Sequence, residues 1–339
     1  MILVTGSNGH LGANLARRLL AGGEQVRVFL RPGSDNSPND GLEVERVFGD
    51  LRDAESVGAA VRGCKRIYHC AAKVSTLDSG QQEIYETNVL GTRHVLEAAR
   101  QAGVEKVVVS GSFSATGYES GRPSDETFPF NPFLKHLPYG FSKAAVEHEC
   151  LKAHADGLPV VVAVSCAILG PGDFKPSRMG RLLVDYGNHR MGAYIPGGFE
   201  FVSTRDIVEG HVLSMNKGRS GQKYIFSTQF LTVDELLEIY QEVTGVPRHG
   251  VRLPPGQMAV IADVADLFLG TFLPRVPRRF TAAAVRILRM HRRADCSKAR
   301  RELGYQPTDI REAIREQFEF FCRQGWIPRA VPTEVLETR

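Results

Sequence analysis

Two side chains of complementary chemistry stand four residues apart near the middle of this 339-residue chain. They are Tyr139 and Lys143, in the segment YGFSK. If the segment is helical, residues four apart lie on one face, so the ammonium of Lys143 can stand beside the phenol of Tyr139. A nearby cation lowers the pKa of a phenol and makes it a usable proton donor or acceptor near neutral pH. Such a pair also arises on solvated helix faces, so its meaning depends on the elements that position it.

A glycine-rich turn follows the first apolar run of the chain. Residues 2–5 predict a strand and residues 11–21 a helix, and the turn between them reads TGSNGHLG. Its glycines permit a tight turn, close approach of the backbone to a pyrophosphate and close helix–strand packing, while the helix N-terminus faces the negative charge. A preceding strand and a following helix distinguish a dinucleotide site from an ordinary glycine turn. We therefore expect a dinucleotide cofactor in contact with Gly6, Asn8, Gly9, His10, Leu11 and Gly12.

The end of the second predicted strand, residues 25–30, bears on the choice of nicotinamide cofactor. NAD sites usually carry a carboxylate there for the ribose hydroxyls, whereas NADP sites favour an arginine for the 2′-phosphate. Leu30 stands where the acid would be, and Arg31 follows it. The alternative interpretation of Arg31 is an ordinary exposed arginine. The sequence thus favours NADP(H), with NAD(H) as the alternative.

The first half of the chain alternates short β-rich runs with helical patterns. Further strands are predicted at 43–48, 66–70 and 106–110, and helices at 53–61 and 81–102. This alternation implies crossover connections and a parallel sheet. Valine runs without alternation, at 107–109 and 160–162, indicate strands covered on both faces.

These patterns predict an α/β fold, a Rossmann-type doubly wound parallel sheet with a smaller C-terminal substrate-binding subdomain. The expected division is a dinucleotide-binding core at 1–165, a mainly substrate-binding part at 166–330 that returns in places to the core, and a tail at 331–339.

Composition excludes several functional classes. Hydrophobic residues make up 42% of the chain and the net charge is only +4, without a basic run that would predict nucleic-acid binding. The six cysteines show no metal-ligand spacing, so we expect free thiols and no metal. We also expect a cytoplasmic protein, because the N-terminus lacks signal-peptide features and the apolar stretch 258–273 is too short to span a bilayer. That stretch is a candidate lid helix.

The glycine loop and the Tyr139-x-x-x-Lys143 pair together resemble the extended short-chain dehydrogenase/reductase superfamily. Further segments match in the same order: GDLRD at 49–53, HCAA at 69–72, TNVLGT at 87–92, VVVSGS at 107–112 and DCSKARRELGY at 295–305. The resemblance covers nearly the whole chain. It is closest to the dihydroflavonol-reductase-like and 3β-hydroxysteroid-dehydrogenase-like branch of the NAD-dependent epimerase/dehydratase family. An arginine directly after the second strand is typical of that branch, whereas sugar-nucleotide epimerases more often have an aspartate there.

The resemblance implies a role for each matching residue. Ser112 would hydrogen-bond the substrate oxygen, with Ser110 and Ser114 as alternatives because the register is ambiguous by two. Tyr139 would exchange a proton with that oxygen as hydride moves, and Lys143 would hold the nicotinamide ribose and keep the phenol acidic. The further cofactor contacts that the resemblance implies are Asp50, Leu51, Cys70, Ala71, Ala72, Asn88, Ser110, Ser165 and Ile168. Ser165 departs from the branch, which usually has a proline there, so the contacts of that segment stay open.

Apolar residues near the expected substrate region are Phe113, Phe174 and Met179. Ordinary core packing is the alternative for each of them. As a group they indicate an apolar substrate rather than a nucleotide sugar. The leading hypothesis is therefore an NADP(H)-dependent ketone reductase or secondary-alcohol dehydrogenase on a fairly apolar small molecule, such as a steroid-like, polyketide-like or flavonoid-like compound.

Two alternatives remain open at this point. One is an NAD-dependent sugar-nucleotide epimerase or dehydratase, and the other, less favoured because the Tyr–Lys pair is present, is a nucleotide sensor without turnover. Dimerisation through helices 81–102 and 139–156 is common in the superfamily, so a homodimer is compatible with the sequence.

Overall fold

The fold is taken from a computed structural model that describes residues 1–74, 80–130, 138–253 and 288–328. The candidate lid helix at 258–273 and the tail at 331–339 lie outside these residues. Among the described helices none combines the length and the apolar character needed to cross a bilayer.

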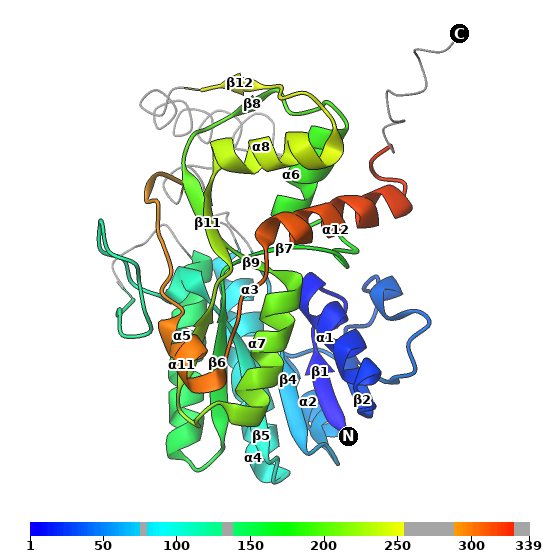
Figure 1. Ribbon diagram of the computed structural model, residues 1–339. Coiled ribbons are helices and arrows are strands. Elements are labelled where there is room, and N and C mark those ends of the chain that lie inside the picture. The colour runs from blue at the N-terminus through cyan, green and yellow to red at the C-terminus, as the bar shows by residue number, and fades with distance from the viewer. Residues whose placement is uncertain (75–79, 131–137, 254–287, 329–339) are drawn as a thin grey trace.

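A seven-stranded parallel sheet forms the centre of the molecule (Figure 1). Its order is β10-β6-β5-β4-β1-β2-β3. The strands are β1 (Ile2–Thr5), β2 (Val26–Leu30), β3 (Glu45–Phe48), β4 (Arg66–His69), β5 (Lys106–Ser112), β6 (Val160–Ser165) and β10 (Lys223–Phe226). The direction of the strand order changes between β1 and β4, and open α/β sheets bind ligands outside the carboxyl ends of the strands at such a point. The predicted doubly wound fold is confirmed.

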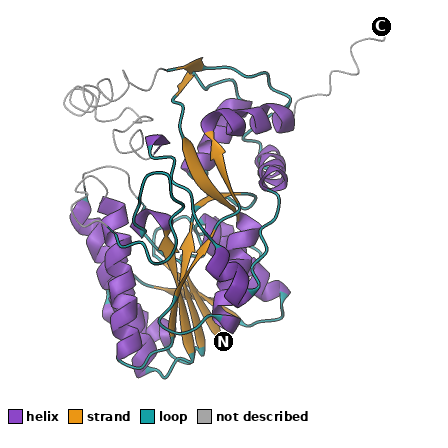
Figure 2. Cartoon of the chain, turned by 60° about the vertical axis from the view of Figure 1, so that its left-hand side comes forward, coloured by secondary structure: helices purple, strands orange, loops and turns teal. Residues whose placement is uncertain are grey.

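Helices cover both faces of this sheet (Figure 2). On one side α2 (Ala54–Val61), α4 (Gly91–Gln101) and α5 (Pro138–Ala155) pack against one another, and on the other α1 (His10–Ala21) packs against α7 (Thr204–Lys217). The strands between them are apolar on both faces: Val107, Val108 and Val109 of β5 are completely buried. A further helix, α11 (Ser297–Leu303), lies against α7 and β10.

The predicted single helix at 81–102 is interrupted in the structure. It consists of α3 (Gln81–Tyr85), a π-helical turn η2 (Glu86–Leu90) and α4. Asn88 lies in that turn and is buried. A π turn widens the helix by one residue per turn, and such turns are frequent at functional sites. Short 3₁₀ turns occur at η1 (Ser37–Asn39) and η3 (Phe113–Ala115).

A second, smaller assembly stands at the carboxyl end of the sheet (Figure 1). Its strands are β7 (Ala167–Leu169), β9 (Gly198–Ser203) and β11 (Gln229–Thr232), with the pair β8 (Ala193–Tyr194) and β12 (Val251–Arg252). Its helices are α6 (Arg178–Gly187), α8 (Val233–Thr244) and α12 (Ile310–Arg323). These elements enclose a hydrophobic core of their own, separate from the core around the main sheet. The functional division at residue 165 stays a prediction.

Candidate active site

The glycine loop is shaped by two close backbone approaches. Gly6 has φ +74°, and a Cβ added there would lie 2.6 Å from the backbone nitrogen of Ala71. A Cβ at Gly12 would lie 2.3 Å from the carbonyl oxygen of Gly6. Side chains at either position are therefore excluded by backbone that cannot move aside. At Gly9 the nearest atom, also the Gly6 oxygen, is 3.4 Å away, so this exposed glycine is not required by packing within the protein.

The residues of this loop fit a dinucleotide. Helix α1 begins at His10, directly after the exposed Gly9, and its first turn contains no acidic residue. Its N-terminus therefore presents positive partial charge without a competing carboxylate. The imidazole of His10 turns into the protein, because its Nε2 lies 3.0 Å from the carbonyl oxygen of Pro171 and 2.9 Å from Oγ1 of Thr204. Burial lowers the pKa of His10, so contact of this residue with a cofactor would involve its backbone.

The end of β2 presents an arginine and no carboxylate. Leu30 is buried, while Arg31 is exposed and donates through Nε to Oγ of Ser34 at 3.0 Å. Asp50, in the turn after β3, is bound by Arg52, which holds the pKa of that carboxyl low, with a smaller contribution from Arg31. The guanidinium of Arg31 therefore lies near the acidic turn, while Asp50 forms its ion pair with Arg52.

The turn after β4 is held against β1 by buried hydrogen bonds. Oγ1 of Thr5 lies 2.7 Å from Nδ1 of His69 and accepts from the backbone nitrogen of Ala71 at 3.2 Å. The other ring nitrogen of His69 lies 3.0 Å from Oγ1 of Thr92 on α4. Burial lowers the pKa of His69 to about 3, so the ring is neutral. The predicted cofactor-contacting turn, Cys70, Ala71 and Ala72, is therefore anchored from both neighbouring elements.

Asn88 joins this turn to the start of α5. Its Oδ1 accepts from the backbone nitrogen of Lys73 at 2.7 Å, and its Nδ2 donates to the Lys73 carbonyl at 3.0 Å and to Oγ of Ser142 at 3.0 Å. Ser142 in turn donates to the carbonyl of Tyr139 at 2.8 Å. The amide of Asn88 is thus fully engaged with protein, which suits a prop for the site rather than a direct ligand of the cofactor.

The three predicted catalytic residues meet at the carboxyl end of β5. Ser112 is the last residue of that strand, and its side chain lies close enough to the phenol of Tyr139 to lower the pKa of that phenol. Nζ of Lys143 donates to the backbone carbonyl of Ser110 at 2.8 Å. The side chain of Ser114 lies beside Ser112, with 2.7 Å between the two Oγ atoms. Of the three candidate serines, Ser112 is the one that acts on the pKa of the Tyr139 phenol, while the hydroxyl of Ser110 lies 2.8 Å from Nε2 of His211.

Burial dominates the electrostatics of this pair. It raises the pKa of Tyr139 to about 12, against a smaller lowering by the hydrogen bond from Ser112. It lowers the pKa of Lys143, whose side chain is 5% exposed, to about 8. Lys143 is not among the causes that shift the pKa of the phenol, so the expectation that it keeps the phenol acidic stays a prediction. The titratable groups that face Lys143 are Cys70 and His69 at β4, Glu147 and Cys150 on α5, and His211 on α7.

Residues predicted around the nicotinamide and the substrate fall into two groups. Ser165 ends β6, pairs with Ser112 across the sheet and donates to the carbonyl of Cys166 at 2.8 Å. Phe113 follows Ser112 directly and is buried. Ile168, in β7, pairs with Val202 of β9 and packs against the core around the main sheet. Phe174 and Met179 are partly buried and pack against the second hydrophobic core, and their contact with a substrate stays a prediction.

One residue near the site was not anticipated from the sequence. Arg292 stacks over the ring of Phe113 at 4.7 Å and donates to the carbonyls of Phe113 and Thr116 at 3.0 and 2.6 Å. It thereby fixes the loop that follows Ser112 from a segment almost 180 residues later. The pair of arginines at 292 and 293 was visible in the sequence, but no local pattern signals a contact of this length.

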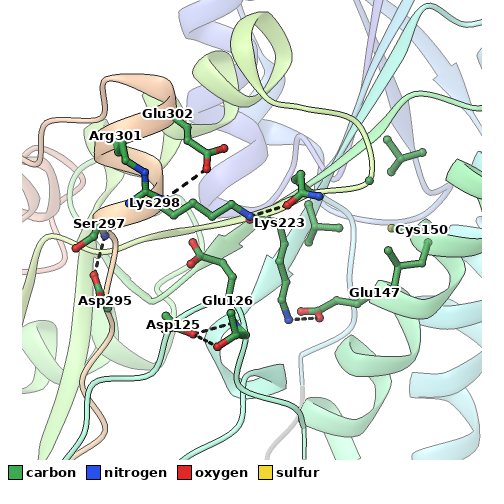
Figure 3. A pocket seen from close by; sticks show the side chains of 16 residues that line it. Asp125, Glu126, Glu147, Cys150, Lys223, Asp295, Ser297, Lys298, Arg301 and Glu302 are labelled. Atoms are coloured by element: carbon green, nitrogen blue, oxygen red, sulfur yellow. Dashed lines mark hydrogen bonds and ion pairs between the residues drawn. The ribbon is translucent and has the colours of Figure 1, made fainter.

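A separate charged pocket of about 490 Å³ lies along the outer edge of β10 (Figure 3). Glu126 accepts from the backbone nitrogen of Ile225 at 2.8 Å, and Lys298 donates to the carbonyl of Lys223 at 2.9 Å. Lys223 also forms an ion pair with Glu147 at 2.8 Å. These side chains satisfy the free backbone groups of an edge strand. The pocket includes none of the predicted site residues.

Known proteins place this arrangement in a family. The model of the NAD dependent epimerase/dehydratase family matches residues 2–226. Sterol demethylase protein B of Methylococcus capsulatus is 42% identical over 325 residues, which is 96% of this chain and 99% of the relative. A putative dihydroflavonol 4-reductase of Synechocystis is 30% identical over 332 residues, 96% of this chain and 95% of the relative.

A solved structure agrees over the same extent. The crystal structure of gox2253 superimposes with a TM-score of 0.85 at 31% sequence identity, covering 96% of this chain and 99% of its own. The chain therefore belongs to the NAD-dependent epimerase/dehydratase family of the extended short-chain dehydrogenase/reductases, and is an NAD(P)-dependent enzyme.

Proposed function

We propose that this protein is an NADP(H)-dependent oxidoreductase that interconverts a ketone and a secondary alcohol on an apolar, steroid-like ring system. The observation that carries the proposal is the contact between the phenol of Tyr139 and Ser112 at the end of β5, beside the buried ammonium of Lys143. The relatives are named for a sterol and for a dihydroflavonol, and both compounds are built on fused rings.

The chemistry follows from the protonation states of these groups. Bound nicotinamide would supply or accept the hydride. With a pKa of about 12, Tyr139 keeps its proton at neutral pH and donates it to a ketone oxygen as negative charge develops there. The Ser112 hydroxyl, which lies beside the phenol, would hold the same oxygen in place. Lys143, charged below its pKa of about 8, adds positive potential at the end of the strand.

Preference for NADP(H) rests on Arg31. Its exposed guanidinium follows the buried Leu30, where an NAD site would offer a carboxylate to the ribose. Asp50 is occupied by Arg52 and so does not replace that carboxylate. A 2′-phosphate would be received bidentately by a guanidinium in this position.

The test is a turnover screen in which both cofactors are offered with a 3-ketosteroid, a dihydroflavonol and UDP-glucose. We expect consumption of NADPH with the apolar ketones, and a clearly higher Michaelis constant for NADH. Conversion of the nucleotide sugar without net cofactor consumption would instead establish the epimerase alternative. A preference for NADH with the same ketones would refute the role of Arg31 and leave the reaction class intact.

A further inference from the structure

A fully buried histidine lies behind the catalytic strand, on the opposite side of the sheet from α5. His211 belongs to α7 and is 0% exposed. Its Nδ1 lies 2.8 Å from the carbonyl oxygen of Ile207, and its Nε2 lies 2.8 Å from Oγ of Ser110. A carbonyl only accepts, so Nδ1 carries the hydrogen. Burial lowers the pKa of His211 to about 4, hence the ring is neutral and Nε2 accepts the hydroxyl proton of Ser110.

Ser110 connects the two faces of the sheet. Its side chain reaches α7, while its backbone carbonyl accepts from the Lys143 ammonium of α5 at 2.8 Å. The side chain and the backbone of this one residue thus link α7 to the ammonium of Lys143.

We propose that His211 is a positioning residue for the reaction: through the hydroxyl of Ser110 it fixes the carbonyl that holds the Lys143 ammonium. This inference rests on the proposed function, in which Lys143 serves the cofactor and the Tyr139 proton transfer. The ammonium is almost completely buried, so water does not substitute for a displaced carbonyl. Without His211 the Ser110 hydroxyl would have to donate to another group near Lys143. That change would shift the end of β5, which carries Ser112.

A neutral imidazole is essential to this arrangement. A protonated His211 would carry hydrogen on both nitrogens, so Nε2 would no longer accept from Ser110. It would also bring a second positive charge toward Lys143, and that repulsion contributes to the low pKa of the ring, after desolvation. The neutral His211 therefore supplies a hydrogen-bond acceptor for Ser110 without placing a second positive charge near Lys143.

The experiment is a double-mutant cycle with His211→Gln, Ser110→Ala and the combined variant. We expect each single change to lower kcat about tenfold with little change in the Michaelis constant of the ketone, since a small misplacement of a catalytic group is costly. The NADPH dissociation constant, followed by nicotinamide fluorescence, should rise in parallel. If His211 acts through Ser110, the double variant is no worse than the poorer single variant.

His148→Gln is the matched control. Its Nδ1 lies 2.9 Å from the carbonyl of Ala144, the same one-turn contact that His211 makes with Ile207, but it does not reach β5. This variant should keep wild-type kcat and NADPH affinity. Thermal unfolding by circular dichroism separates loss of fold from loss of positioning, and Ser110→Ala carries the test alone if His211→Gln does not fold.

Two results would overturn the inference. One is folded Ser110→Ala protein with wild-type kcat and NADPH affinity, and the other is a multiplicative loss in the double variant. Failure of the proposed function has a different signature, because Tyr139→Phe would then retain full activity. The NADPH titration also needs no organic substrate, so it reports on Lys143 even if the ketone is of another class.

Discussion

The two ends of the site are held by opposite means. At the glycine loop, Gly6 and Gly12 bring backbone against backbone, at positions where any added carbon atom meets a main-chain atom within 3 Å. At the end of β5, position is set by side chains with mutually satisfied polar groups, such as Asn88 and His211. The glycine loop should therefore be sensitive to substitutions that add atoms. The end of β5 should be sensitive to substitutions that remove hydrogen-bond partners.

The largest effect should come from adding one atom to the glycine loop. In Gly12→Ala the new Cβ would lie 2.3 Å from the Gly6 oxygen, so the loop must shift. We expect a loss of about 1–3 kcal/mol in unfolding free energy, typical of overpacking, and loss of measurable cofactor binding. Calorimetric titration with NADPH and chemical denaturation measure the two quantities.

Gly58→Ala in α2 is the control for that change, since a Cβ there meets nothing within 4 Å. It should stabilise the protein by about 0.5–1 kcal/mol, as expected for alanine in a helix. If Gly12→Ala behaved like Gly58→Ala, the steric account of the loop would be wrong.

The next effect comes from removing a hydrogen-bond partner at the end of β5. Asn88→Ala leaves the Lys73 backbone nitrogen and Ser142 without their partner, at a cost of about 1–3 kcal/mol in unfolding free energy. We also expect kcat to fall, because both sides of the cofactor turn depend on this amide. Steady-state kinetics and denaturation provide the readouts.

Asn188→Ala is the control for Asn88→Ala, because Asn188 lies outside the candidate site. That side chain donates to the carbonyls of Val184 and Trp326 at 2.7 and 2.8 Å within the second core. It should lose stability while retaining kcat. Equal losses of kcat in the two variants would mean that stability alone governs activity.

A smaller change is expected at the exposed rim of the cofactor site. Arg31→Ala should raise the Michaelis constant for NADPH about tenfold, which corresponds to about 1.4 kcal/mol, and leave that for NADH unchanged. Arg100→Ala, at an exposed position of α4, is the control and should alter neither constant. An equal effect of Arg31→Ala on both cofactors would argue against contact with the 2′-phosphate.

The smallest effect is a pH dependence of cofactor affinity. Burial lowers the pKa of Lys143 to about 8, so its charge is present below that pH and is lost above it. Between pH 7 and about 8.5 the charged fraction falls about fourfold, and NADPH affinity should fall with it. Cys70 and Tyr139, with pKa values of about 11 and 12, remain protonated in this window, and His211, near 4, stays neutral. In Lys143→Arg the dependence should vanish; its persistence there would assign it to another group.

The sequence predicts those parts of the site that depend on residues close together in the chain. The glycine spacing, the Tyr139–Lys143 interval and the strand–helix alternation predict the sheet and the meeting of Ser112 with α5, because each depends on neighbouring residues in one or two elements. The π turn around Asn88 replaces part of a predicted regular helix, since the amide is drawn to Lys73 and Ser142 by contacts made elsewhere in the fold.

Long-range partners account for what the sequence does not reveal. Ser110 and His211 are 101 residues apart, and Phe113 and Arg292 are 179 apart, so no spacing links them. Desolvation raises the pKa of Tyr139, and this effect depends on the surrounding fold, so the spacing to Lys143 does not reveal it. Phe174 and Met179 are partly buried against the second core, and contact of either with a substrate stays a prediction.

The most direct test of the account is single-turnover hydride transfer from NADPH to a 3-ketosteroid in Tyr139→Phe, with Tyr85→Phe as an exposed control. We expect the transfer rate in Tyr139→Phe to fall by about 10²–10⁴-fold or more, with NADPH affinity unchanged and the control at the wild-type rate. A wild-type transfer rate in Tyr139→Phe would contradict the proposed role of the phenol.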